Sequence, residues 1–128
     1  MNERYVLDSS AVLCLIDEEL GSEKVASILA GSMISAVNLA EVVAKLQERG
    51  GTDAMIDASM ADLDVEIVDF DTAQAVATGK LRNLTRSRGL SLGDRACLAL
   101  AASRDAIAVT TDRAWQNLND VTRVLLVR

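Results

Sequence analysis

The sequence contains no histidine, so the most common general base and the most common zinc ligand are both missing from any site that the chain can build. Proline is also absent, and only three of the 128 residues are aromatic. The core must therefore consist mainly of alanine, leucine, valine and isoleucine. Any catalysis must rest on carboxylates, hydroxyls, a metal ion, or lysine and arginine side chains.

Long apolar runs are missing as well. No apolar run approaches the roughly 18 residues of a membrane-spanning helix, and no basic stretch precedes an apolar segment at the start of the chain. We therefore expect a cytoplasmic protein without membrane contact. No linker or low-complexity stretch interrupts the composition, which predicts one domain over residues 1–128.

Only two cysteines are present. Cys14 and Cys97 lie far apart, each inside an apolar helical pattern. This placement favours two buried, reduced thiols, which are common in protein cores. A disulfide between them is the alternative that the sequence leaves open.

Basic residues are outnumbered, with 13 Lys and Arg against 19 Asp and Glu, for a net charge of −6. This balance argues against broad, nonspecific binding of nucleic acid, which needs a basic surface. One segment is an exception to this acidic balance, because four basic residues fall within nine positions with only uncharged residues between them. This basic segment could contact phosphates, or it could be a solvated helix end that the helix dipole favours. Its members are Lys80, Arg82, Arg86 and Arg88.

Short strand patterns alternate with helical patterns along the whole chain. Strands are expected at 4–7, 33–35, 65–68, 107–110 and 124–127. Helices are expected at 11–16, 22–30, 37–49, 53–63, 72–85, 92–103 and 113–118. The alternation predicts an α/β fold with a central parallel sheet of four to five strands, covered by helices on both faces.

Four acidic residues are expected at one rim of this sheet, because ligand sites of such folds lie at the carboxyl ends of the strands. Asp8 directly follows the first predicted strand, and Asp112 closely follows the fourth. Glu41 lies in the first turns of the helix after the second strand. Asp94 is placed only by its position in the first turn of its own helix.

Each acid also has a purely structural explanation. Segments 91–94 and 38–41 match the start of a capping box, the second only if its helix begins that late. Asp112 could cap a short helix and still offer its second oxygen to a metal ion. Asp8 could form a turn with the two serines that follow it.

Taken together, the acids favour a metal site. Carboxylates gathered at one rim repel each other unless a cation compensates them. Oxygen ligands without histidine select Mg²⁺ or Mn²⁺ over Zn²⁺. Such a site is suited to hydrolysing a phosphodiester, because the ion activates water and stabilises charge on the phosphate oxygens.

Four segments resemble, in order, the motifs of one family, the PIN-domain ribonucleases, and in particular the VapC-type toxins of bacterial toxin–antitoxin pairs. The segments are 5–11, 34–42, 91–101 and 110–115. The resemblance implies a PIN-like three-layer α/β/α fold. It also implies endonuclease cleavage of RNA of the tRNA or rRNA class, dependence on Mg²⁺ or Mn²⁺, a homodimer, and inhibition by a cognate antitoxin protein.

The resemblance also assigns residues. Ser10 and Thr110 match hydroxyl positions that support the first and last acids, and the basic segment becomes a tentative RNA-binding element. The helices at 11–30 and 37–63 could leave a groove for an antitoxin segment, or could simply pack as core. The residues that carry over as catalytic and metal-binding are Asp8, Glu41, Asp94 and Asp112.

Two other functions compete with this hypothesis. A non-catalytic, Mg-binding signalling domain of the receiver type needs paired acids after the first strand and a lysine after a late strand, but no lysine follows residue 80. A phosphatase with an aspartate nucleophile usually has a second aspartate two residues after the first. Ser10 occupies that position here.

Overall fold

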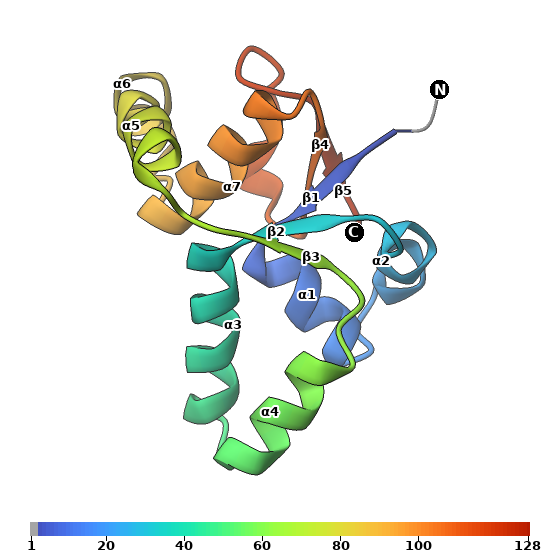
Figure 1. Ribbon diagram of the computed structural model, residues 1–128. Helices are drawn as coiled ribbons and strands as arrows, with labels where there is room; N and C mark the ends of the chain where they lie inside the picture. Colours follow the sequence, from blue (N-terminus) through green and yellow to red (C-terminus); the bar gives the residue numbers. More distant parts are fainter. Residues whose placement is uncertain (1–2) are drawn as a thin grey trace.

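A five-stranded parallel sheet forms the centre of the protein in the computed structural model, which describes residues 3–128 (Figure 1). The strand order is β3-β2-β1-β4-β5, and each neighbouring pair is parallel. The predicted strands are confirmed to within one residue at either end. Their bounds are β1 Tyr5–Leu7, β2 Met33–Ser35, β3 Glu66–Val68, β4 Ile107–Thr110 and β5 Val124–Leu126.

Helices cover both faces of the sheet, as the alternation predicted (Figure 1). The prediction of one helix over residues 72–85 was wrong, because the first helix ends at Lys80 and a second short helix begins at Arg82. The bounds are α1 Ser9–Ile16, α2 Ser22–Ile28, α3 Ala36–Glu48, α4 Asp53–Ala61, α5 Thr72–Lys80, α6 Arg82–Thr85 and α7 Leu92–Ser103, with 3₁₀ turns η1 Arg86–Arg88 and η2 Arg113–Trp115.

Successive side chains along each strand point to opposite faces of the sheet and so build two separate cores. Val6 points into the core under α7, and the next residue, Leu7, points into the core under α1 to α4. This alternation is the two-residue period of a strand buried on both faces. Trp115 is fully buried in the α7-side core. Its role there is packing.

The chain leaves the carboxyl ends of β1 and β4 in opposite directions. These two strands are neighbours in the sheet. After β1 the chain enters α1, which packs on one face, whereas after β4 it enters η2, whose Trp115 packs on the other. In open parallel sheets this divergence opens a crevice at the carboxyl ends of the two strands. Asp8 and Asp112 stand at this crevice because each follows one of them.

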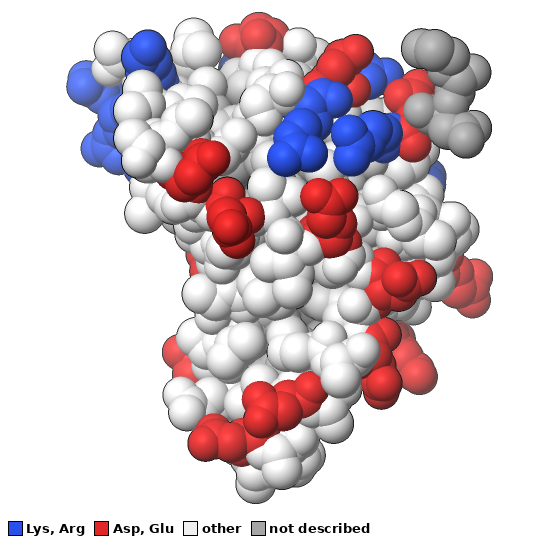
Figure 2. All heavy atoms as spheres, in the orientation of Figure 1, with Lys and Arg blue, Asp and Glu red and all other residues white. Residues whose placement is uncertain are grey.

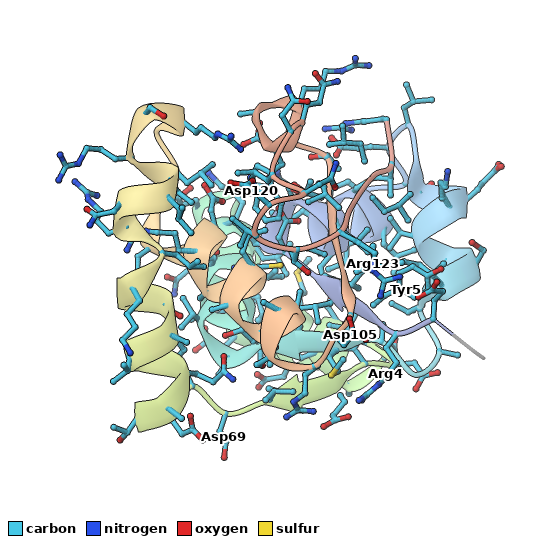
Figure 3. All side chains as sticks on the ribbon, turned by 90° about the horizontal axis from the view of Figure 1, so that it is seen from above. Arg4, Tyr5, Asp69, Asp105, Asp120 and Arg123 are labelled. Atoms are coloured by element: carbon cyan, nitrogen blue, oxygen red, sulfur yellow. The ribbon has the colours of Figure 1, made fainter. Side chains whose placement is uncertain are left out.

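Ion pairs gather at the opposite edge, near the amino ends of the strands. Arg123 donates to Glu3 at 3.0 Å and lies 3.8 Å from Asp105, which precedes β4 (Figure 3). Arg4 lies 4.0 Å from Glu66. Acids at this edge therefore have arginine partners.

Two further expectations concern the cysteines and membrane contact. Cys14 and Cys97 are both buried and free, which confirms the expectation of reduced thiols. Within residues 3–128, no helix combines the length and the apolar character that a membrane span requires.

Candidate active site

Asp8 is the most buried of the four acids, with 3% of its surface exposed. It caps the amino end of α1, where its Oδ1 accepts from the Ala11 amide at 2.8 Å and from the Ser10 hydroxyl at 2.7 Å. Its Oδ2 accepts from the Thr110 hydroxyl at 2.6 Å. Three donors from two different strand ends therefore hold one carboxylate in a single orientation.

The two hydroxyls on Asp8 also join β1 to the segment after β4. Ser10 Oγ accepts from the Thr111 amide at 3.0 Å, and Thr110 Oγ1 accepts from the Asp112 amide at 3.0 Å. The hydroxyls themselves lie 3.3 Å apart. Ser10 and Thr110 are the hydroxyls that the sequence motifs singled out, and both contact the same carboxylate.

Asp94 occupies the first turn of α7, where it completes the expected capping box. Its Oδ2 accepts from the Ser91 amide at 2.9 Å, and Ser91 Oγ accepts from the Asp94 amide at 3.1 Å. The charge of Asp94 also reaches Asp8, because it contributes to the raised pKa of that carboxyl. Asp94 therefore faces the same crevice while capping its helix.

Glu41 does not belong to a capping box, because α3 begins at Ala36 with Ser35 as its cap. The Glu41 carboxylate lies instead against the backbone of Gly93 at the start of α7. Its Oε1 accepts from Asn38 Nδ2 at 2.9 Å. Because α3 packs against α7, Glu41 thus lies against the residue that directly precedes Asp94.

Sequence reasoning missed two of these residues as parts of the site. Asn38 was noted only as the possible start of a cap, and Gly93 only as part of a motif. Of the two, Gly93 could have been recognised from the sequence. A glycine in the first turn of a helix lowers helix stability, so its presence there indicates that a larger side chain would not fit. Its φ is not positive, so space rather than backbone conformation is the reason for glycine here.

Cys97 is a buried residue of α7 on which the charges of three of the acids act. Its thiol is fully buried one turn after Asp94 and points toward the Val6 carbonyl at 3.8 Å. Burial raises the pKa of the Cys97 thiol well above its ordinary value, and the charges of Asp8, Asp94 and Glu41 raise it further. The charges of Asp8, Glu41 and Asp94 therefore all act on the part of α7 that packs against β1.

Asp112 joins the others through the backbone. Its Oδ1 accepts from the Ala114 amide at 2.9 Å, which makes it the cap of η2 as expected. Its side chain is exposed. Its own amide bonds Thr110 Oγ1, which donates to Asp8. A single hydroxyl therefore links the first and last acids of the set.

No basic side chain compensates these acids. Within the described chain, none of the four forms an ion pair, in contrast to the acids at the amino edge of the sheet. Hydrogen bonds occupy one oxygen each of Glu41, Asp94 and Asp112 and leave the second oxygen of each available. This set of hard oxygen donors suits Mg²⁺ or Mn²⁺. As the side chains lie, no three acidic or cysteine residues in 3–128 are placed to hold one ion together.

The basic segment lies on α5, α6 and η1, directly before Ser91 and α7. Figure 2 shows basic side chains gathered on the surface over α5 and α6. Lys80, Arg82 and Arg86 are exposed, and among the described residues they have no acidic partner. Arg88 donates to the Asn117 carbonyl at 2.8 Å, which ties the segment to the loop after Asp112.

The burial of Asp8 predicts how the stability of the metal-free protein depends on pH. Burial, and to a smaller degree the charge of Asp94, raises the pKa of Asp8 from 3.8 to about 6 against the opposing effect of its three hydrogen bonds. The folded state therefore keeps a proton that the unfolded state has lost between these values. The free energy of unfolding is expected to fall by about 2 kcal/mol as pH rises from 4 to 6.

Urea denaturation with EDTA between pH 4.5 and 8 measures this dependence. Asp8→Asn should flatten the curve, since the substituted side chain does not titrate. The control is Asp71→Asn, because Asp71 caps α5 with the same geometry, accepting from the Gln74 amide at 2.9 Å, but is exposed. A curve for Asp8→Asn as steep as that of Asp71→Asn would contradict the prediction.

Comparison with known proteins was made on sequence and on structure. The model of the PIN domain family matches residues 5–121. No curated protein matches the chain. The solved structures similar to it include a DNA-bound VapBC from Salmonella typhimurium, with a TM-score of 0.77 at 18% identity, covering 99% of this chain and 100% of that one.

Two other structures extend the comparison. A toxin–antitoxin complex from Klebsiella pneumoniae has a TM-score of 0.76 at 16% identity and covers 97% of this chain and 98% of that one. VapC20 from Mycobacterium tuberculosis, a toxin that cleaves the sarcin–ricin loop, has a TM-score of 0.68 at 16% identity, covering 85% of this chain and 90% of that one. At these identities the likeness is one of fold.

Proposed function

Because the chain belongs to the PIN domain family, we propose that it is a divalent-metal-dependent endoribonuclease that hydrolyses RNA phosphodiester bonds. One observation carries this proposal. At the crevice between β1 and β4, the buried carboxylate of Asp8 is held by Ser10 and Thr110, and none of the four acids forms an ion pair in the described chain. The alternative of a receiver-like signalling domain has no comparable support, since the late lysine that it needs is missing.

In this proposal the acids Asp8, Glu41, Asp94 and Asp112 hold Mg²⁺ or Mn²⁺. When bound, the ion activates the attacking water and stabilises charge on the phosphate oxygens. Ser10 and Thr110 donate to Asp8 and keep its carboxylate turned toward the crevice. Asp94 and Asp112 stand at the amino ends of α7 and η2, where the backbone amides add local positive potential beside the reacting phosphate.

The direct experiment incubates the purified chain, free of any partner, with structured RNA and either Mg²⁺ or Mn²⁺. Cleavage that stops with EDTA supports the proposal. Sequencing of RNA 5′ ends after brief expression would identify the cut and distinguish tRNA from rRNA. An absence of cleavage with both ions, by protein that unfolds cooperatively, would contradict the catalytic proposal.

The basic segment is proposed to bind RNA phosphates beside the acids. Replacing Lys80, Arg82 and Arg86 together with alanine should raise KM for RNA by about 10-fold or more and leave kcat nearly unchanged, because phosphate contacts contribute binding rather than chemistry. The slope of log KM against log salt concentration should fall by about 2, from the counterions of three single-strand contacts. Cleavage kinetics at several salt concentrations measure both quantities.

The control for this prediction replaces two basic residues elsewhere on the surface. Lys24 and Lys45 are exposed on α2 and α3, away from the segment. Their alanine double variant should keep the KM and salt slope of the wild type. If the triple variant also behaves like the wild type, the segment is only a solvated helix end.

We further propose that the chain is the toxin of a toxin–antitoxin pair, acting as a cytoplasmic homodimer that a cognate antitoxin inhibits. The toxin–antitoxin and VapBC complexes among the similar structures support this proposal. So does an apolar groove of about 290 Å³ where the ends of α1 and α3 meet α4, lined in part by Ile16, Leu46, Met55 and Ile56. Met55 is 62% exposed. An amphipathic antitoxin helix would cover such a groove.

A further inference from the structure

Asn38 is a buried polar residue on α3 with 1% of its surface exposed. Its Nδ2 group donates to Glu41 Oε1 at 2.9 Å and to the Gly93 carbonyl at 3.0 Å. Both partners are pure acceptors, so the orientation of the amide is determined by its surroundings. One NH₂ group therefore joins a carboxylate on α3 to the backbone of α7, 55 residues away in the chain.

The position of this bridge determines where Glu41 stands. Asn38 and Glu41 lie three residues apart on the same face of α3. The Gly93 carbonyl belongs to the residue before Asp94. The absence of a side chain at Gly93 lets the Glu41 carboxylate lie directly on the α7 backbone. The amide thus holds Glu41 next to Asp94 from one side, and the glycine makes room for it on the other.

The chemistry of an amide suits this task. A lysine or arginine at position 38 would neutralise Glu41 and compete with a cation for it. An amide donates without adding charge, and it leaves Glu41 Oε2 without a hydrogen bond in the described chain. The Asn38 Oδ1 atom is buried and has no hydrogen-bond partner within residues 3–128, which lowers the stability of the fold. A side chain that served packing alone would not carry this penalty.

We infer that Asn38 is a positioning residue, which holds the Glu41 carboxylate beside Asp94 and so sets the affinity of the acidic site for a divalent ion. This inference rests on the proposed function, since it names a residue that supports the same site. Asn38 contacts neither the ion nor the RNA in this account. Its effect passes through Glu41.

The test is a double-mutant cycle read out by direct Mn²⁺ binding. Calorimetric titration of the metal alone compares the wild type, Asn38→Ala, Glu41→Gln and the double variant. Asn38→Ala is expected to raise the Mn²⁺ dissociation constant by about 10- to 100-fold, the usual effect of losing the partner of a metal ligand. In the Glu41→Gln background the same change should have less than about a two-fold effect, because the residue through which Asn38 acts is already neutral.

A matched control separates positioning from the loss of any buried polar group. Thr78 on α5 is fully buried, and its hydroxyl has no partner among the described residues. Thr78→Val should leave Mn²⁺ binding unchanged. Asn38→Ser, which keeps a small polar side chain, replaces Asn38→Ala in the cycle if the alanine variant does not fold.

The outcomes distinguish this inference from the proposed function. Wild-type protein that binds Mn²⁺ and cleaves RNA, together with an Asn38→Ala variant of equal affinity, overturns the inference and leaves the function standing. An equal loss of affinity in both Glu41 backgrounds overturns it too, because Asn38 would then act independently of Glu41. Wild-type protein that neither binds Mn²⁺ nor cleaves RNA refutes the function, and the role of Asn38 falls with it.

Discussion

Asp8→Asn is expected to lower metal-dependent RNA cleavage by at least about 100-fold while the protein remains folded. Asp8 lies at the centre of the site, where two hydroxyls and one amide orient it. Replacing its carboxylate with an amide removes the negative charge that would hold a divalent ion but keeps the size of the side chain. Cleavage of a defined RNA with Mn²⁺, measured beside the urea stability of the same preparation, tests this expectation.

The hydrogen bonds around position 8 can accept an amide. The new carbonyl oxygen can take the place of Oδ1 and receive the bonds from Ala11 and Ser10. The Thr110 hydroxyl can rotate toward Ser10 Oγ, 3.3 Å away, and accept from the new NH₂ group. Asp8→Asn thus removes the buried charge and keeps the hydrogen bonds. The variant should therefore be as stable as the wild type at pH 8 without metal, or more stable.

The same result is expected for the other three acids. Asp94→Asn and Asp112→Asn keep their helix caps, since asparagine caps helices as well as aspartate does. Glu41→Gln keeps an oxygen that can accept from Asn38. Asp71→Asn is again the control, because it alters a cap of the same kind far from the crevice. If the four substitutions unfold the protein while retaining cleavage per folded molecule, the acids are caps and not ligands.

Gly93→Ala is expected to lower cleavage by about 10- to 100-fold through a single added methyl group. A Cβ at this position would lie 2.6 Å from Glu41 Cδ and closer still to its oxygens, far inside normal contact distance. The carboxylate must therefore leave its place beside Asp94. Because the overlap is with the end of a flexible side chain, which can move aside at little cost, the free energy of unfolding should fall by no more than about 1 kcal/mol. Cleavage assays and urea denaturation measure the two effects.

Two further variants make this prediction specific. Gly79 lies in α5, and an added Cβ there meets nothing within 4 Å. Gly79→Ala should therefore stabilise the protein by up to about 1 kcal/mol and leave cleavage unchanged. In a Glu41→Ala background the overlap is gone, so Gly93→Ala should become neutral or stabilising. A loss of stability that persists in that background would show that the methyl group collides with something other than Glu41.

Much of the architecture could be predicted because it depends on local pattern. The strand Ile107–Thr110 and the helix Leu92–Ser103 begin and end where expected, since a two-residue or helical apolar period is visible in a short window. The caps at Asp94 and Asp112 are equally local, because donor and acceptor lie within three residues. The break at Leu81 was missed because no proline marks it, and Gly79, two residues before it, does not have a positive φ.

The candidate site was only partly predictable. The rule that sites lie at the carboxyl ends of parallel strands predicts from the sequence that Asp8 and Asp112 lie near each other. The surroundings of Glu41 could not be predicted from the sequence, because they depend on how α3 packs against α7. The contact of Glu41 with Gly93 joins residues 52 positions apart in the numbering, and no local pattern encodes it.

The sequence by itself thus determined the elements, the alternation that makes the sheet parallel, the absence of histidine and hence the oxygen-only character of the site, and the four acids in family order. Only the tertiary structure decided that two hydroxyls hold Asp8, that Glu41 lies against Gly93, and that Asn38 ties Glu41 to α7. The physical reason is the separation along the chain between the residues that interact. Secondary structure and caps follow from neighbours within a few residues, whereas each contact that shapes the site depends on two distant segments packing against opposite sides of one crevice.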